Sequence, residues 1–331
     1  MTIAPNKIAR ARKLWRRLWR GIRRKHQILT AVSLPDAQES MLLDRARCDA
    51  FREAIRRTVK PGDVVVDLGA GTGLLSFFAA QAGARRVYAI EANAIADVAA
   101  ELIEVNGFRE RITLIRNNSM KVRLPERCDV LISEILSVFC FDEENAIEFI
   151  ADARERFLKP GGRIIPQAAD TFVMPFSSEV FGLGGLVAGV PGEEPSFYGL
   201  DYRPLTKRLN ECRVVTASGK PLLALSQPGH CYSVDFRKDR QNPGKTFVPF
   251  RLACDGRIDG FLGWFEAQLC DGVGLSNSPF LPPTTWGQLY LPVLEQPQCH
   301  AGQTLLLCLD PDMVAGDAWW SYAVQTADSD K

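Results

Sequence analysis

Histidines, paired cysteines and long apolar runs are all scarce in this chain of 331 residues. It has three histidines, His26, His230 and His300, and none stands at metal-ligand spacing from another or from a cysteine. The nine cysteines form no CxxC pair, which argues against a disulfide framework and against a zinc ribbon. No apolar run approaches the roughly 20 residues of a membrane-spanning helix. We therefore expect a soluble cytoplasmic protein of about two domains, with reduced thiols and no resident metal.

Acidic residues are absent from the first 35 positions. Ten basic residues lie between Lys7 and Lys25, so the rest of the chain carries a net charge of −9 although the whole chain carries +1. Within residues 7–25, Trp, Leu and Ile recur at helical spacing. Such a helix can lie on an anionic membrane surface, bind nucleic acid, dock on the acidic remainder, stay solvated or act as a targeting segment. We treat residues 1–35 as a separate basic segment with these alternatives open.

Residues 36–166 alternate helical patterns with short β-branched runs. Helices are predicted over residues 41–59, from residue 74, over about 94–106 and over about 144–158. Strands are predicted at residues 64–68, 86–90, 112–115, 130–133 and 163–166, the last after a turn at 159–162. This alternation is typical of a doubly wound α/β sheet, which binds ligands at the carboxyl ends of its strands.

A glycine-rich turn, residues 69–73 (GAGTG), follows the first of these strands, and Glu91 ends the second. A dinucleotide-binding turn reads GxGxxG, but its third glycine position is Leu74 in one register and Ser76 in the other. With Asp67 just before it, the turn suits a cofactor without phosphates whose cationic amino-acid end benefits from a carboxylate. S-adenosylmethionine is such a cofactor. A Rossmann enzyme with another ligand and a purely structural turn are the alternatives.

Two glutamates bracket the end of the fourth predicted strand. Glu134 follows that strand, and Glu143 opens the next helix nine residues later. The apolar segment between them can form a hairpin that presents both carboxylates to one pocket, where their repulsion favours a cation between them. A guanidinium fits, because it is planar, always charged and able to bond carboxylates in pairs. Alternatively, Glu143 complements a helix dipole after an Asp142 cap, and Glu134 faces solvent.

Residues 64–93 (VVVDLGAGTGLLSFFAAQAGARRVYAIEAN), the DVLISE run with its second Glu, and RERFLKPGGRIIP resemble the protein arginine methyltransferases. The resemblance extends from about Met41 to Pro166. It continues more faintly at residues 197–201, which resemble a dimerisation arm, and at residues 278–286, which resemble a substrate loop that normally reads Thr-His-Trp.

The resemblance implies a class I methyltransferase fold, with a Rossmann-like sheet over residues 36–166. It also implies a β-barrel substrate domain over residues 167–331, with a dimerisation arm at about 190–215 and assembly as a homodimer. Short β-branched and aromatic runs between Gly and Pro turns in the second half agree with a β domain. The implied activity is methyl transfer from S-adenosylmethionine to a guanidinium nitrogen of arginine in a basic protein or peptide.

The same resemblance implies a role for each candidate site residue. Arg47 would hold the cofactor carboxylate, Glu91 the ribose hydroxyls, and Ser119 with Met120 the adenine. The implied cofactor-binding residues are Arg47, Asp67, Gly69, Gly71, Gly73, Glu91, Ser119 and Met120. Glu134 and Glu143 would clasp the substrate guanidinium as the catalytic pair. The implied substrate-binding residues are Met41, Thr285 and Trp286.

The chain departs from the family pattern at several positions. No Phe precedes Phe51 and no Tyr precedes Tyr88, so the usual aromatic N-terminal motif is missing. Thr285 stands where the family has a histidine that supports the double-Glu loop, and Met120 stands where it has an acidic residue. These departures leave two other functions open. One is methyl transfer to a small molecule or a non-arginine peptide nitrogen, and the other is cofactor binding without transfer.

Overall fold

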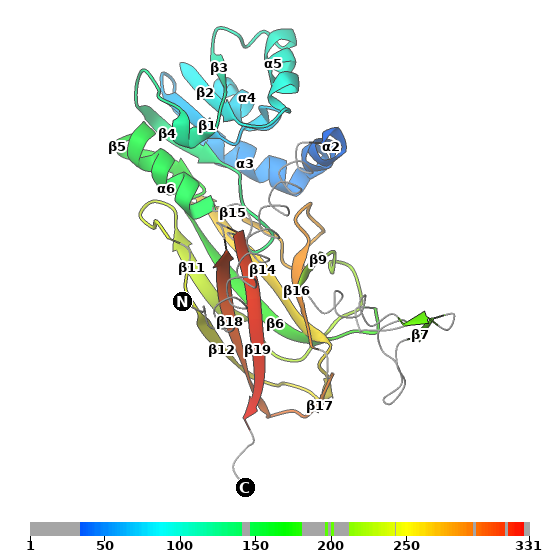
Figure 1. The fold of residues 1–331 in the computed structure, drawn as a ribbon. Coiled ribbons are helices and arrows are strands. Elements are labelled where there is room, and N and C mark those ends of the chain that lie inside the picture. The colour runs from blue at the N-terminus through cyan, green and yellow to red at the C-terminus, as the bar shows by residue number, and fades with distance from the viewer. Residues whose placement is uncertain are drawn as a thin grey trace, which may run out of the picture.

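The computed structural model describes residues 34–140, 146–180, 196–197, 200–201, 212–241, 243–293, 296–314 and 317–327. The predicted helix at residues 7–25, Glu143 and most of the predicted arm at 190–215 lie outside these ranges. The described chain has two parts, a parallel sheet with its helices and a set of long antiparallel strands (Figure 1). None of the described helices is long and apolar enough to cross a membrane. The nine cysteines are free thiols.

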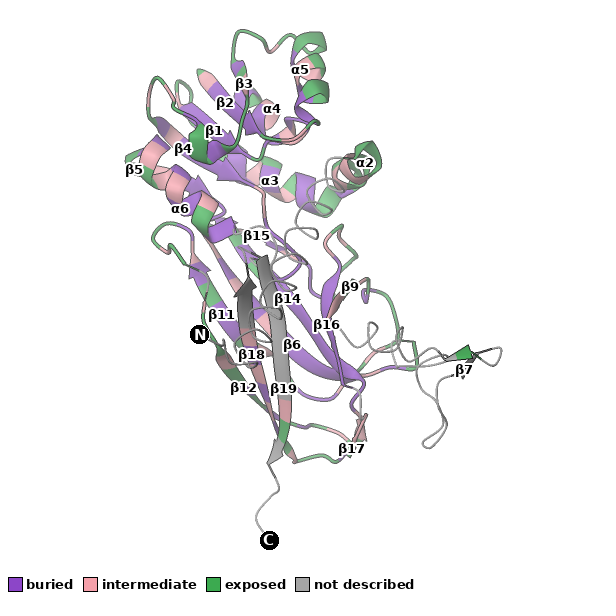
Figure 2. Ribbon diagram, viewed as in Figure 1, coloured by how far each residue is buried: buried purple, intermediate pink, exposed green. Residues whose placement is uncertain are grey.

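The parallel sheet has the strand order β3-β2-β1-β4-β5. Its strands are β1 (Val64–Leu68), β2 (Arg86–Glu91), β3 (Ile112–Arg116), β4 (Cys128–Ser133) and β5 (Leu158–Ile165). Its helices are α2 (Pro35–Leu43), α3 (Arg45–Thr58), α4 (Leu74–Gln81), α5 (Ala96–Val105) and α6 (Ala146–Phe157). All of β1 is buried, as expected for a strand with helices on both faces (Figure 2). The predicted doubly wound sheet is confirmed.

The strand order reverses between β1 and β4, and this reversal creates the site. The chain runs outward from β1 through β2 to β3 and then returns to place β4 on the other side of β1. In the resulting register Leu68 pairs with Ser133. The glycine turn after β1 and Glu134 after β4 therefore leave the sheet side by side, where ligands of such folds bind.

Two local predictions were wrong. The helix predicted over residues 41–59 is divided into α2 and α3 at Asp44, whose ψ of 88° is not helical. The Asp44 carboxylate caps the new helix by accepting a hydrogen bond from the Arg47 amide at 3.0 Å, which stabilises the break. The turn predicted at residues 159–162 lies within β5, where the register against β4 shifts between Cys128 and Val130.

The second part is built from antiparallel strands. The larger sheet has the order β10-β6-β14-β16-β9, with β11 also paired to β6 and β15 to β14, and a smaller sheet has the order β12-β18-β19. These strands are β6 (Ala168–Ser177), β9 (Arg213–Val215), β10 (Leu223–Ala224), β11 (Gly229–Asp235), β12 (Thr246–Arg251), β14 (Gly260–Cys270), β15 (Val273–Ser276), β16 (Gln288–Pro292), β18 (Thr304–Val314) and β19 (Asp317–Ala327). This part also has two short two-stranded sheets. One pairs β7 (Ser196–Phe197) with β8 (Leu200–Asp201), and the other pairs β13 (Gly256–Arg257) with β17 (Gln298–Cys299).

One hydrophobic core extends through both parts. It includes strands of the parallel sheet together with residues of β11, β14 and β18. Phe139, from the segment after Glu134, is fully buried in this core. A Cβ added to Gly263 of β14 would lie 2.9 Å from the Phe139 ring, so the two are in close contact. The segment after Glu134 is therefore packed against the antiparallel part.

Candidate active site

The glycine-rich turn approaches the segment that follows Glu134. The amides of Gly69 and Ala70 both donate to the carbonyl of Ile90, at 2.9 and 3.0 Å, which ties the turn to the end of β2. Gly69 has a φ of +74°, and a Cβ there would lie 2.6 Å from a side-chain carbon of Ile135. Glycine is required here for both reasons, because a side chain would be strained and would push the turn away from Glu134.

Glu91 holds the other side of this turn. Its Oε2 accepts a hydrogen bond from the Gly71 amide at 2.9 Å, and its Oε1 accepts two from Asn93, at 2.8 and 3.0 Å. The carboxylate is buried. A carboxylate oxygen can accept two hydrogen bonds, so Oε2 keeps capacity for a hydroxyl donor. The geometry therefore fits the predicted contact with a ribose hydroxyl.

Asp67 is a fully buried carboxylate two residues before Gly69. Its Oδ2 accepts a hydrogen bond from Ser76 Oγ at 2.7 Å, whereas its Oδ1 has no hydrogen-bond partner within the described residues. Burial raises the pKa of Asp67 to about 6, although the bond from Ser76 opposes the shift. A buried carboxylate that lacks donors favours positive charge in front of the turn. This fits the cationic end of S-adenosylmethionine.

Asp67→Asn is expected to change both stability and cofactor binding with pH. The raised pKa means that the folded chain binds a proton between about pH 4 and 6 that the unfolded chain has lost. The free energy of unfolding therefore falls as the pH rises through this window, by about 2–3 kcal/mol from this group. The Asn variant should lack that fall, should melt higher than wild type at pH 8 without ligand, and should bind S-adenosylmethionine roughly tenfold more weakly there.

Thermal unfolding from pH 4 to 8 and titration calorimetry measure these effects. Glu110→Gln removes an exposed carboxylate and is the control, expected to match wild type in both measurements. Equal cofactor affinity of Asp67→Asn and wild type at pH 8 would contradict the electrostatic role.

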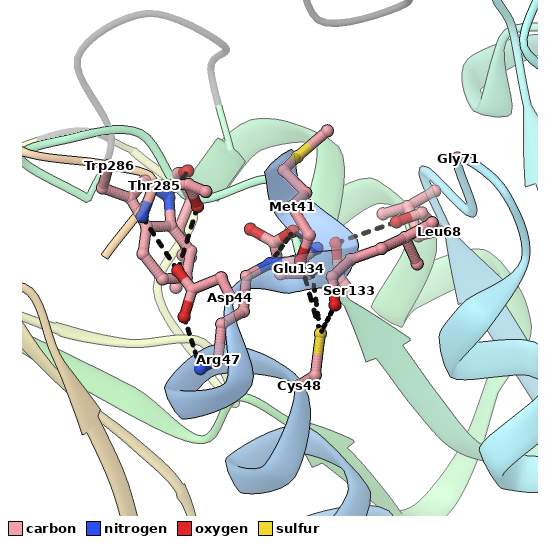
Figure 3. Close-up of polar contacts among 12 residues, drawn as sticks. Met41, Asp44, Arg47, Cys48, Leu68, Gly71, Ser133, Glu134, Thr285 and Trp286 are labelled. Carbon is pink, nitrogen blue, oxygen red and sulfur yellow. Dashed lines mark hydrogen bonds and ion pairs between the residues drawn. The ribbon is translucent and has the colours of Figure 1, made fainter. Parts of the chain in front are cut away.

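Arg47 and Glu134 form a buried ion pair at the carboxyl end of β4 (Figure 3). Arg47 Nε donates to Glu134 Oε2 at 3.0 Å and Nη2 bonds the same oxygen, while Nη1 donates to the carbonyl of Met41 at 3.2 Å. Burial raises the pKa of Glu134, against the attraction of Arg47. Burial alone would lower the pKa of Arg47, but the attraction of Glu134 outweighs it and the pKa is raised. Among the described residues none donates to Glu134 Oε1.

Thr285 and Trp286 bring the antiparallel part to this pair. The amide and Oγ1 of Thr285 donate to Asp44 Oδ2, at 2.8 and 3.1 Å, and Asp44 Oδ1 caps α3 at Arg47. Trp286 Nε1 donates to the carbonyl of Leu136 at 2.8 Å. In Figure 3 the two lie on one side of Glu134, and Gly71 lies on the other. Thr285 thus acts on α3, whereas its neighbour Trp286 supports the segment after Glu134.

Asp44 is the site residue that the sequence analysis missed. It ends α2, begins α3 and joins Thr285 to the helix that carries Arg47. A capping signal was present, because Asp stands three residues before Arg47. Unbroken helical periodicity across residues 41–59 concealed it.

Thr285→Val is expected to lower stability by about 1 kcal/mol, and to lower the methyl transfer that the sequence resemblance implies by less than about tenfold. The substitution removes the Oγ1 bond, while the Thr285 amide still donates to Asp44. Thr285→Ser keeps the hydroxyl and should behave as wild type. Initial rates and thermal unfolding give both quantities. Complete loss of transfer in the Val variant, with the fold intact, would show a role beyond this contact.

The remaining predicted residues lie at the same edge of the sheet. Ser119 and Met120 are in the short 3-10 helix η1 (Ser119–Lys121), which follows β3. Ser119 is buried and its carbonyl accepts a hydrogen bond from Arg156 at 2.7 Å, while Met120 is 43% exposed. Within the described residues no three His, Cys, Asp or Glu side chains are grouped to hold a metal ion.

The parallel sheet and the site at its edge have the arrangement of a Rossmann-like methyltransferase fold. Residues 51–167 match the family model described as ribosomal protein L11 methyltransferase (PrmA). The chain is 33% identical over 266 residues to protein arginine N-methyltransferase 6 of Danio rerio, which covers 76% of this chain and 75% of that protein. The chain therefore belongs to the protein arginine N-methyltransferase family.

A second relative agrees with this assignment. The chain is 34% identical over 281 residues to the probable histone-arginine methyltransferase CARM1 of Oryza sativa subsp. indica, which covers 81% of this chain and 53% of that protein. It thus spans about half the length of that relative.

Two solved structures share the fold. They are the Trypanosoma brucei PRMT1 enzyme-prozyme heterotetrameric complex with AdoHcy and an open conformation of Arabidopsis thaliana protein arginine methyltransferase 10. The first has a TM-score of 0.75 at 23% identity, over 87% of this chain and 96% of that one. The second has a TM-score of 0.74 at 24% identity, over 90% and 99%.

Proposed function

We propose that this chain transfers a methyl group from S-adenosylmethionine to a guanidinium nitrogen of arginine in a basic protein or peptide. The observation that carries the proposal is the buried carboxylate of Glu134, which already pairs with a guanidinium, that of Arg47. Both Arg47 bonds reach Oε2, so Oε1 is the oxygen that can accept the N–H groups of an incoming arginine. The acidic remainder of the chain favours a basic partner.

The Glu134 carboxylate is proposed to make a guanidinium nitrogen more nucleophilic, which is the difficult part of the reaction. Guanidinium nitrogens are poor nucleophiles because their lone pairs are delocalised. Glu134 attracts the positive charge toward the nitrogens that it bonds and leaves the remaining nitrogen better able to attack a methyl carbon. Arg47 fixes the direction of the Glu134 carboxylate, and Glu143 is the proposed second carboxylate. Holding the guanidinium in line with the methyl group supplies the rest.

The chain's own residues would hold the cofactor along the sheet edge. Bound S-adenosylmethionine supplies the methyl group. Glu91 would accept from its ribose, and the charge of Asp67 would favour its ammonium group. Arg47 has five N–H groups, and its bonds to Glu134, Met41 and Cys48 leave the second N–H of Nη2 for the cofactor carboxylate. Arg47 is thus proposed to contact both the cofactor carboxylate and Glu134, the carboxylate that binds the substrate.

The test identifies the methylated amino acid. Purified protein is incubated with methyl-labelled S-adenosylmethionine and arginine-rich peptides, the product is hydrolysed, and the labelled residue is identified, with Glu134→Gln as the blank. Labelled methylarginine that is absent from the blank is the expected result. Label in a small molecule or in another amino acid, or bound cofactor without any transfer, would contradict the proposal.

A second copy of the chain is the proposed partner, through the arm at residues 190–215. The described hairpin of β7 and β8 supports this, because it lies away from the antiparallel sheets (Figure 1). Sedimentation velocity is expected to give the mass of a dimer, and a monomer at every concentration would contradict it.

The cytoplasmic location stays a prediction, as does membrane or nucleic-acid binding through residues 7–25. Cosedimentation of the full chain with anionic vesicles, at low and high salt, tests the membrane alternative.

A further inference from the structure

Asn277 is a buried amide between β15 and the loop that carries Thr285 and Trp286, and it is 1% exposed. Its Oδ1 accepts a hydrogen bond from the Phe265 amide at 2.8 Å. Its Nδ2 donates to the carbonyls of Val138 and Gly287, at 2.8 and 2.6 Å. The orientation of the amide follows from these partners, because one N–H needs an acceptor and two carbonyls need donors.

Two of the bonds from the antiparallel part reach the backbone just after Glu134. Trp286 Nε1 bonds the carbonyl of Leu136, and Asn277 Nδ2 bonds the carbonyl of Val138. Phe139 follows at once and packs against Gly263 of β14. Strand β4 ends at Ser133, so its ladder does not extend to this segment. Two side-chain donors and one glycine of the antiparallel part therefore hold this segment at Leu136, Val138 and Phe139.

We propose that Asn277 is a positioning residue for Glu134. By holding the carbonyl of Val138, it sets the path of residues 135–140 and hence the place of the carboxylate at their start. The inference rests on the proposed function, since it assigns Glu134 to the substrate guanidinium. Asn suits the position because Asp has no donor for the two carbonyls, and a buried carbonyl without a donor is costly.

Gln288 offers a matched control. It is also a buried amide, 1% exposed, and lies in the same network. Its Oε1 accepts from the Ala217 amide at 2.7 Å, and its Nε2 donates to the carbonyl of Asn277 at 2.7 Å and to Ser218 at 3.3 Å. None of these partners belongs to residues 134–140. Loss of the Gln288 amide removes a bond to the Asn277 backbone but leaves the side-chain bond from Asn277 to Val138, so it should release the segment after Glu134 less than loss of the Asn277 amide does.

The experiment compares Asn277→Leu with Gln288→Leu at a temperature well below both melting midpoints. Asn277→Leu is expected to lower kcat roughly 10- to 100-fold, since small misplacements of a catalytic group have effects of this size. Its affinity for S-adenosylmethionine should match that of Gln288→Leu, whose kcat should fall less because the Asn277 side chain still bonds the carbonyls of Val138 and Gly287 there. Gly263→Ala places a methyl group too close to the Phe139 ring, in the same segment, and should also lower kcat. A kcat for Asn277→Leu within about threefold of wild type would overturn the inference.

Hydrogen–deuterium exchange of the full chain without substrate separates this inference from the proposed function. Peptides that cover residues 135–140 should exchange faster in Asn277→Leu than in Gln288→Leu. Exchange of these peptides in Asn277→Leu at the wild-type rate overturns the inference even if wild type is an active arginine methyltransferase. If wild type transfers no methyl group to arginine, the proposed function fails, and the exchange result still decides whether Asn277 holds the segment. If Asn277→Leu does not fold, Asn277→Ser, too short to reach both carbonyls, takes its place in both measurements.

Discussion

Glu134→Gln is expected to lower methyl transfer to arginine roughly 100- to 1000-fold, the range seen when a preorganised charge or dipole is removed from an active site. Glutamine has nearly the same shape as glutamate but carries no charge. It therefore cannot draw positive charge toward one side of a guanidinium. The affinity for S-adenosylmethionine should stay within about threefold, because the glycine turn, Asp67 and Glu91 are unchanged.

Single-turnover rates with a labelled methyl group and titration calorimetry measure the two quantities. Glu126→Gln is the control, since Glu126 accepts hydrogen bonds from Arg85, just before β2, and from Tyr88 within it. Substantial transfer by Glu134→Gln, with methylarginine as the product, would remove Glu134 from the catalytic pair. Loss of transfer together with loss of cofactor affinity would indicate a damaged cofactor site.

Arg47→Met is expected to have the largest effect on stability. The side chains of Arg47 and Glu134 are 11% and 9% exposed, so the substitution leaves a buried carboxylate without its cation. Breaking such a pair costs about 3–5 kcal/mol. Burial then raises the pKa of Glu134 without opposition, so the free energy of unfolding should fall further as the pH rises and the group must ionise. Cofactor affinity should fall as well, through the lost contact to its carboxylate.

The double variant Arg47→Met/Glu134→Gln identifies the cause of this loss. The second substitution removes the unpaired Glu134 charge. It should therefore recover much of the stability that Arg47→Met loses, without restoring methyl transfer. Urea unfolding at pH 6 and pH 8 for the two single variants and the double variant gives the coupling energy. If the double variant is as unstable as Arg47→Met at both pH values, the loss reflects packing and not the buried charge.

The parallel sheet was predictable from the sequence because its signals are local. The run VVVDL is β-branched and apolar, as a strand buried on both faces requires, and β1 has the predicted bounds of residues 64–68. The Gly69 turn was equally readable, since positive φ angles and a close approach to Ile135 require glycine. The position of Glu91 beside the glycine turn could be predicted because the carboxyl ends of neighbouring strands meet at one edge.

Only the tertiary structure decided which groups meet Glu134. Arg47 is 87 residues away from it in the chain, and the contact between Thr285 and Asp44 joins positions 241 residues apart. No periodicity or spacing encodes such contacts, because they depend on how the antiparallel part packs on the sheet edge.

The difference between the two parts of the chain has one physical reason. A strand, a helix or a glycine turn is selected by the conformational preferences of a few consecutive residues, and those are written in the sequence. The position of the Glu134 carboxylate depends instead on a distant guanidinium and on two donors, Trp286 and Asn277, that hold the carbonyls after it. The sequence by itself therefore determined the parallel sheet and its glycine turn, and packing between the two parts decided how the Glu134 carboxylate is held.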